Sequence, residues 1–111
     1  MTSNEIELSS KTVEKIVEEL SKKLDVMPGL SSILDVYSMN MYHKRFIELF
    51  VEEPKKAYKV VEKVFAGNRD SINFILKYLL RTFTRNDELI SKIIDELSRG
   101  NDELLKKIMF G

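Results

Sequence analysis

The chain has 111 residues, of which 43% are hydrophobic and 32% charged, and its 18 basic and 18 acidic side chains give a formal net charge of zero. This length suits one domain with one core, and the absence of cysteine excludes disulfides, thiolate metal sites and thiol nucleophiles. Because no uncharged run is long enough to cross a bilayer and the first residues do not resemble a signal peptide, we expect a cytoplasmic protein with no membrane contact.

The first predicted helix runs from Ser9 to about Leu24. Ser9 is suited to cap its N-terminus, and Leu8 would then pack on Val13 as a hydrophobic staple. The preceding residues 1–8 are polar, and we expect them to be frayed. The apolar residues of the helix recur at helical spacing and form one face, made of Val13, Ile16, Val17, Leu20 and Leu24.

The second segment, residues 32–53, is irregular in its helical phase. Ser32 and Asp35 have the spacing of a capping box that would open it. Its apolar residues divide into two sets that point in different directions. Either the helix breaks near residues 38–40 and gives two short helices in one core, or one long helix leaves an apolar face for a partner. The two sets are Leu30, Ile33, Leu34, Tyr37 and Met41, and then Phe46, Ile47, Leu49 and Phe50.

A straight second segment would leave more apolar surface than one core can cover. A symmetric homodimer would bury that surplus by using the same surface twice. We therefore expect self-association. The candidate dimer interface consists of Leu34, Tyr37, Met41, Phe46 and Phe50.

The third helix is predicted over residues 54–66, because proline favours the first helical position and Gly67 suits a C-terminal cap. Asp70 is then suited to cap the next helix. That helix, residues 71–84, is apolar over roughly 200° of its circumference, so we expect other helices to surround it. The residues expected to be almost fully buried are Ile75, Leu76, Leu79 and Phe83.

Two similar segments follow, each beginning with an asparagine that can cap a helix, Asn86 and Asn101, and with acidic residues in the first turn. No composition break divides the chain. The sequence therefore predicts an all-α fold, a compact bundle of about six short helices around the central hydrophobic helix 71–84, with no sheet and a single domain over 1–111. The abundance of Lys and Glu resembles the composition of thermophile proteins.

The residues that catalysis or metal binding would need are largely missing. His43 is the only histidine, no cysteine accompanies it, and nothing locates a nucleophile that it could activate. The chain also lacks the glycine-rich phosphate-binding and dinucleotide-binding motifs. We therefore predict a protein that is not an enzyme, with no cofactor, no metal and no small-molecule substrate.

Charge is segregated along the chain although it sums to zero. Residues 1–53 carry six basic and ten acidic side chains, residues 54–85 carry eight and two, and residues 86–111 carry four and six. Like charges at i,i+4 spacing repel one another, so the lysine row of the third helix is unusual. We call the following residues the basic set, the candidate contacts for a partner or for phosphate: Lys55, Lys59, Lys63, Arg69, Lys77, Arg81 and Arg85.

Three interpretations of the basic set remain open. In the first, it faces the acidic flanks, either within one subunit or across a homodimer. In the second, it docks an acidic protein partner. In the third, residues 54–85 form a helix-turn-helix whose basic side chains contact nucleic-acid phosphates. The predicted recognition helix is mostly apolar, which limits the third interpretation to backbone contacts. We predict a helical protein-protein interaction module that binds itself or an acidic protein, with nucleic-acid binding through the residue 54–85 unit as the alternative.

Overall fold

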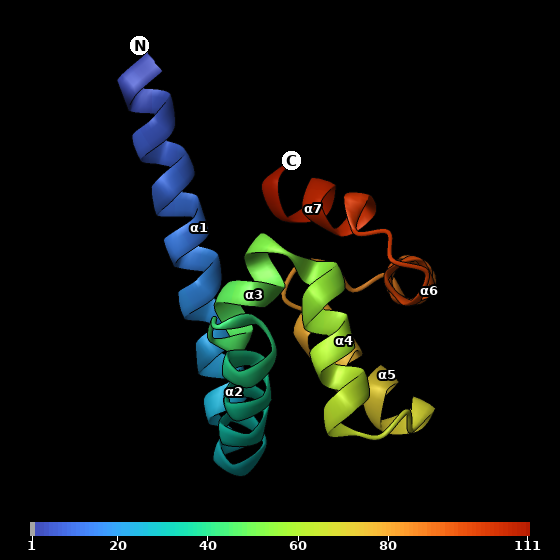
Figure 1. Ribbon diagram of the computed structural model, residues 1–111. Helices are drawn as coiled ribbons and strands as arrows, with labels where there is room; N and C mark the ends of the chain where they lie inside the picture. Colours follow the sequence, from blue (N-terminus) through green and yellow to red (C-terminus); the bar gives the residue numbers. More distant parts are fainter. Residues whose placement is uncertain (1) are drawn as a thin grey trace.

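The computed structural model describes residues 2–111, with side chains from residue 12 onward, and over this range it contains seven helices and no strand. The all-α bundle is therefore confirmed (Figure 1). The helices are α1 (Thr2–Asp25), α2 (Pro28–Tyr42), α3 (Phe46–Glu52), α4 (Pro54–Val64), α5 (Arg69–Leu80), α6 (Asp87–Ser98) and α7 (Glu103–Phe110). Because α1 already begins at Thr2, Ser9 is not its N-cap, and the predicted contact of Leu8 lies outside the described side chains.

The irregular second segment is two helices, α2 and α3. His43 ends α2 in the left-handed conformation, with φ of 60°. The hydroxyl of Ser38 donates to the carbonyl of Lys44 at 2.6 Å, which fixes the direction of the connection. The break falls at residues 43–45, a few residues later than predicted, and it turns Phe46 into the core.

This break corrects the predicted dimer interface. Leu34, Phe46 and Phe50 are completely buried inside one chain. They pack in the shared core and have no surface left to offer a partner. Tyr37 and Met41 remain exposed.

Two helix N-termini are capped by aspartates from elsewhere in the chain. Neither α3 nor α4 has a capping side chain of its own. The backbone N–H of Phe46, at the start of α3, donates to Asp35 Oδ1 at 2.9 Å. The backbone N–H of Lys55, in the first turn of α4, donates to Asp102 Oδ2 at 3.4 Å. The predicted capping box is therefore wrong: α2 begins at Pro28, and Asp35 lies inside it and caps α3 instead.

The later helices begin close to the predicted positions. Asn86 caps α6 as predicted, by accepting a hydrogen bond from the backbone N–H of Leu89. Asn68, not Asp70, caps α5, so that α5 starts before the expected residue. Asp102 occupies the N-cap position of α7, but the predicted Asn101 accepts a hydrogen bond from the first turn, with 3.0 Å between the backbone nitrogen of Glu103 and Asn101 Oδ1.

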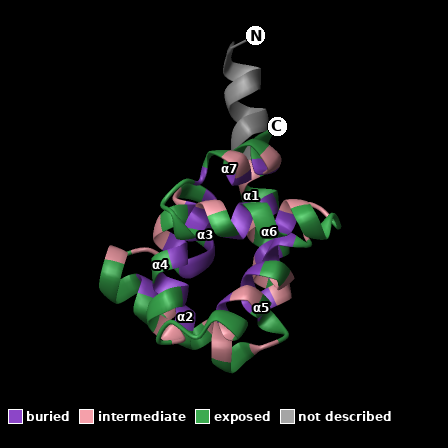
Figure 2. Cartoon of the chain, turned by 90° about the vertical axis from the view of Figure 1, so that its right-hand side faces the viewer, coloured by how far each residue is buried: buried purple, intermediate pink, exposed green. Residues whose placement is uncertain are grey.

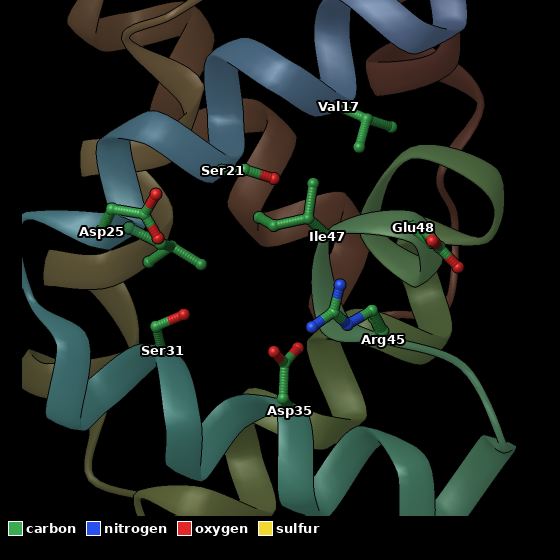
Figure 3. Close-up of a pocket in the computed structure, with 9 residues that line it drawn as sticks. Val17, Ser21, Asp25, Ser31, Asp35, Arg45, Ile47 and Glu48 are labelled. Carbon is green, nitrogen blue, oxygen red and sulfur yellow. The ribbon is translucent and has the colours of Figure 1, made fainter.

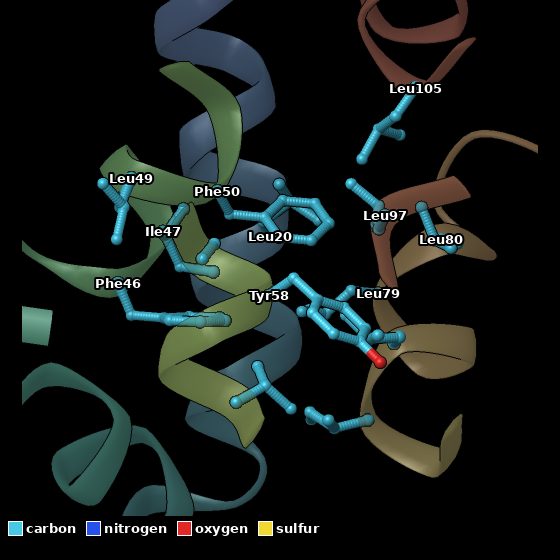
Figure 4. Packing of buried hydrophobic residues seen from close by; sticks show 14 of the residues in the cluster. Leu20, Phe46, Ile47, Leu49, Phe50, Tyr58, Leu79, Leu80, Leu97 and Leu105 are labelled. Atoms are coloured by element: carbon cyan, nitrogen blue, oxygen red, sulfur yellow. The ribbon is translucent and has the colours of Figure 1, made fainter. Parts of the chain in front are cut away.

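One hydrophobic core joins all seven helices. Figure 4 shows side chains of α1, α3, α4, α5, α6 and α7 meeting in it, and Leu34 adds α2. As expected, α5 contributes fully buried residues, among them Ile75, Leu76 and Leu79. It is nevertheless covered on one side only, because Phe74 is 61% exposed. Phe83, which we expected to be almost fully buried, lies beyond the end of α5 at Leu80 and is half-buried. The helix α4 links the two halves of the bundle, because it contacts both α2 and α3 and also α6.

Two reciprocal hydrogen bonds join α1 to α5. The Tyr78 hydroxyl donates to the carbonyl of Lys23 at 2.7 Å, and the Lys23 ammonium donates to the carbonyl of Tyr78. The ammonium also lies 4.7 Å from the centre of the Tyr78 ring. Both carbonyls belong to last helical turns, where no intrahelical N–H reaches them. Each side chain thus caps the C-terminus of the other helix.

Candidate functional site

The lysines of the basic set on α4 form an exposed row. Lys55, Lys59 and Lys63 lie on the side of α4 opposite its buried residues, and all three are exposed. Within the described part of the chain they make no ion pair. Their neighbour Lys56 behaves differently, because it pairs with Glu53 at 2.9 Å and its hydrogen bond lowers the pKa of that carboxyl. The row is therefore a strip of positive charge without ion pairs, although Glu62 is exposed beside it.

The rest of the basic set lies elsewhere. In Figure 2 α4 lies to the left of α5, and the Arg69 guanidinium at the start of α5 donates to the Tyr58 hydroxyl on α4 at 3.4 Å. Arg69 and Lys77 line a groove of about 400 Å³ between α5 and α6, together with Asp95. Arg81 is paired with Asp87 at 2.9 Å, and Arg85 is exposed beyond the end of α5. The structure thus brings the lysines together but does not join them to the arginines in one surface.

This placement bears on two of the three interpretations. Because α4 packs mainly on α2, α3 and α6, and α5 mainly on α6, the two helices do not pack together as a helix-turn-helix unit would. Charge pairing within the chain accounts for Arg81, which meets an acidic residue of the C-terminal flank. It does not account for Lys55, Lys59 or Lys63.

The exposed side of α2 is apolar. Large hydrophobic side chains between 37% and 57% exposed project from it, namely Ile33, Val36, Tyr37, Met39 and Met41. By helical phase, a strip of five residues lies at the centre of this side, which we call the α2 face: Gly29, Ile33, Val36, Tyr37 and Asn40. Met39 and Met41 flank it.

The α2 face carries no charge. The only charged residue of α2 is Asp35, and its carboxylate is turned to the N-terminus of α3. By contrast, every residue on the exposed side of α4 is charged. The same asymmetry is visible in the sequence, because residues 28–42 hold one charged side chain in a chain of which 32% is charged. Our prediction named Tyr37 and Met41 but missed Val36, because it assigned the surplus apolar surface to Phe46 and Phe50.

A second pocket, of about 300 Å³, lies between α1, α2 and the start of α3. Asp35 and Arg45 point towards each other in it, and Asp25 and Glu48 contribute further carboxylates (Figure 3). Asp35 is already engaged with the backbone of α3. His43 is exposed at the end of α2 and does not line this pocket.

Neither metal-binding clusters nor membrane spans occur in the part of the chain with described side chains. It holds no group of three or more His, Cys, Asp or Glu side chains placed to bind a metal ion. None of its helices combines the length and the apolar character needed to cross a membrane. Comparison with known proteins finds no match: no family model, no curated sequence and no solved structure matches this chain.

Proposed function

We propose that this protein is a non-enzymatic interaction module that docks an apolar protein surface on the α2 face. The observation that carries the proposal is the set of exposed hydrophobic side chains on a helix side without charge. Contiguous apolar surface of this kind marks interaction sites on folded proteins. Residues such as Ile33, Val36, Tyr37 and Asn40, spaced by three and four, are the anchors of helix docking. The absence of cysteine suits a reducing compartment, and we propose the cytoplasm.

Desolvation explains why such a surface binds. Apolar side chains that leave water on docking each contribute favourable free energy, and an uncharged helix side has no ionised group whose hydration must be given up. Tyr37 adds a hydroxyl that stays at the edge of the contact while its ring is covered. The α2 face therefore selects partners by apolar shape, and not by charge.

Docking on the α2 face is tested with a fluorescently labelled amphipathic helical peptide that has one uncharged, leucine-rich side. Titrating this peptide with protein from about 10 µM to 1 mM should raise its fluorescence anisotropy. Val36→Glu places a carboxylate at the centre of the α2 face and should weaken binding at least about tenfold. The matched control is Phe74→Glu, which introduces the same charge at a similarly exposed hydrophobic residue of α5. Identical titrations for the wild type and Val36→Glu would overturn the proposal.

Nucleic-acid binding is the second candidate, and the unpaired lysine row of α4 favours it. Three lysines at i,i+4 spacing would contact successive phosphates of a duplex backbone without reading its sequence. Counterion release then gives log K a slope of about −2.7 against log salt concentration for three contacts. Lys59→Glu should flatten that slope, whereas Lys92→Glu on α6 should not. Absence of duplex binding at low salt removes this candidate.

A further inference from the structure

We propose, as a step that rests on the docking function just described, that the partner on the α2 face is a second copy of this chain, with the two α2 helices packed antiparallel. Charge is the first reason. Charged side chains on a partner surface would lose their hydration on docking, and the α2 face has no opposite charge to compensate for that loss. The fitting partner surface is itself uncharged and apolar, and the α2 face of a second copy has this character.

The spacing of the α2 face is the second reason. Gly29, Ile33, Val36 and Asn40 follow one another at intervals of four, three and four residues, which is the seam of a helix pair. An antiparallel two-fold arrangement sets Ile33 of each copy against Val36 of the other. It also sets Gly29 against Asn40 of the other copy. The pattern is thus complementary to itself, as an isologous interface requires.

Gly29 supplies an independent observation. Glycine is unfavourable within a helix, yet it occupies the first turn of α2 without a positive φ that would require it. A Cβ added there would meet no atom within 4 Å. The single chain therefore gives no reason for a glycine at this position. Close approach of a second helix gives one, because the missing side chain leaves room for Asn40 of the second copy.

The orientation follows from the helix dipoles. Two parallel α2 helices would set dipoles of the same direction side by side. An antiparallel pair opposes the two dipoles, which is the favourable arrangement.

The length of α2 sets the strength of the contact. A helix of 15 residues is about 22 Å long. Such a helix pair buries an area at or below the lower end of specific interfaces, about 1,200 Å² in total. An interface of this size belongs to the class of weak, transient contacts, so the dimer is measured by the concentration dependence of its mass.

Sedimentation equilibrium from about 1 to 500 µM tests the proposal. The weight-average mass should rise from 13.0 kDa towards twice that value, at moderate and at high salt alike. Val36→Glu should remain at 13.0 kDa, and Phe74→Glu should follow the wild type. Gly29→Ala is the second variant, because it leaves the fold of the monomer intact. It should melt at a higher temperature than the wild type and yet dimerise at least about threefold more weakly.

A constant mass of 13.0 kDa for the wild type, or an unchanged dimer for both Val36→Glu and Gly29→Ala, overturns the proposal. The peptide titration separates this failure from that of the docking function. A monomeric wild type that still binds the peptide through Val36 refutes the second copy alone. A monomeric wild type that binds no peptide refutes both.

The absence of native cysteine allows a direct test of orientation. An equal mixture of Ile33→Cys and Val36→Cys proteins, oxidised and analysed by mass spectrometry, should give mainly the mixed disulfide dimer. A parallel pair would instead give mainly Ile33→Cys and Val36→Cys homodimers, which would contradict the antiparallel arrangement.

Discussion

Replacing Tyr78 by phenylalanine removes one hydroxyl from the contact between α1 and α5 and leaves the ring in place. In the wild type that hydroxyl caps the Lys23 carbonyl at 2.7 Å. The Lys23 ammonium still reaches the Tyr78 carbonyl and still lies over the ring in the variant, since neither contact uses the hydroxyl. The substitution therefore isolates a single hydrogen bond between segments 55 residues apart.

The expected loss is about 1 kcal/mol. A typical intramolecular hydrogen bond contributes about 0.5–1.5 kcal/mol net, and the Lys23 carbonyl has no alternative partner within its helix. For a chain of 111 residues the unfolding entropy is roughly 0.23 kcal/mol per kelvin near 60 °C. The melting temperature of Tyr78→Phe should thus fall by about 4 °C.

Thermal melts followed by circular dichroism and urea titrations measure this difference. Tyr42→Phe is the matched control, because Tyr42 is also half-buried beneath a lysine, Lys56, with 5.4 Å between the ammonium and the ring centre. The Tyr42 hydroxyl makes no hydrogen bond to the described residues, so its removal should be nearly neutral. If Tyr78→Phe and Tyr42→Phe unfold at the same temperature, the reciprocal capping of α1 and α5 does not stabilise the fold.

Three further outcomes follow from burial, backbone conformation and ionisation. Leu79→Ala should lower the free energy of unfolding in urea titrations by about 2–5 kcal/mol, because Leu79 is completely buried. Lys77→Ala, on the exposed side of α5, should leave that free energy unchanged, and equal effects of the two substitutions would contradict the assignment of Leu79 to the core. Ala66→Gly should raise the unfolding free energy by about 0.5–1 kcal/mol, because Ala66 has φ of 50°; a destabilised variant would refute this. Burial, and then the Glu62 carboxylate, raise the pKa of Tyr58 above 10.0, so the unfolded chain releases this proton first and stability falls as pH rises through 10.0 and the folded-state pKa. Tyr58→Phe should lose less stability than the wild type in that range, and parallel pH profiles would argue against the raised pKa.

Local sequence chemistry predicted the starts of two helices. Pro54 begins α4 and Asn86 caps α6, each as expected from its own backbone preference. Gly67 has the expected positive φ, but it is not the cap of α4, which already ends at Val64. The break between α2 and α3 was harder to place, because His43 adopts the left-handed conformation that glycine or asparagine would have indicated. Boundaries were predictable where the residue at the boundary determines the conformation.

Interactions between distant segments were not predictable in this way. Asp35 had the spacing of a local capping box but caps α3, and the contact between Lys23 and Tyr78 has no sequence pattern at all. The α2 face was also not predictable from local sequence alone, because it depends on how distant segments pack. Helical phase identified surplus apolar residues around 32–53, but only the direction of the break decided that Phe46 and Phe50 are core and that Val36 is surface.

The aspartate that caps α4 has a consequence for synthesis of the chain. Lys55 leaves the ribosome 47 residues before Asp102, whose carboxylate accepts the hydrogen bond from the backbone N–H of Lys55. Throughout that interval α4 lacks this cap, and its buried side also waits for α6. The contacts of α4 with α2 and α3 can form as soon as α4 has emerged, whereas its contact with α6 and its N-terminal cap can form only later. The native environment of α4 is therefore complete only when the segment that leads into α7 has been synthesised.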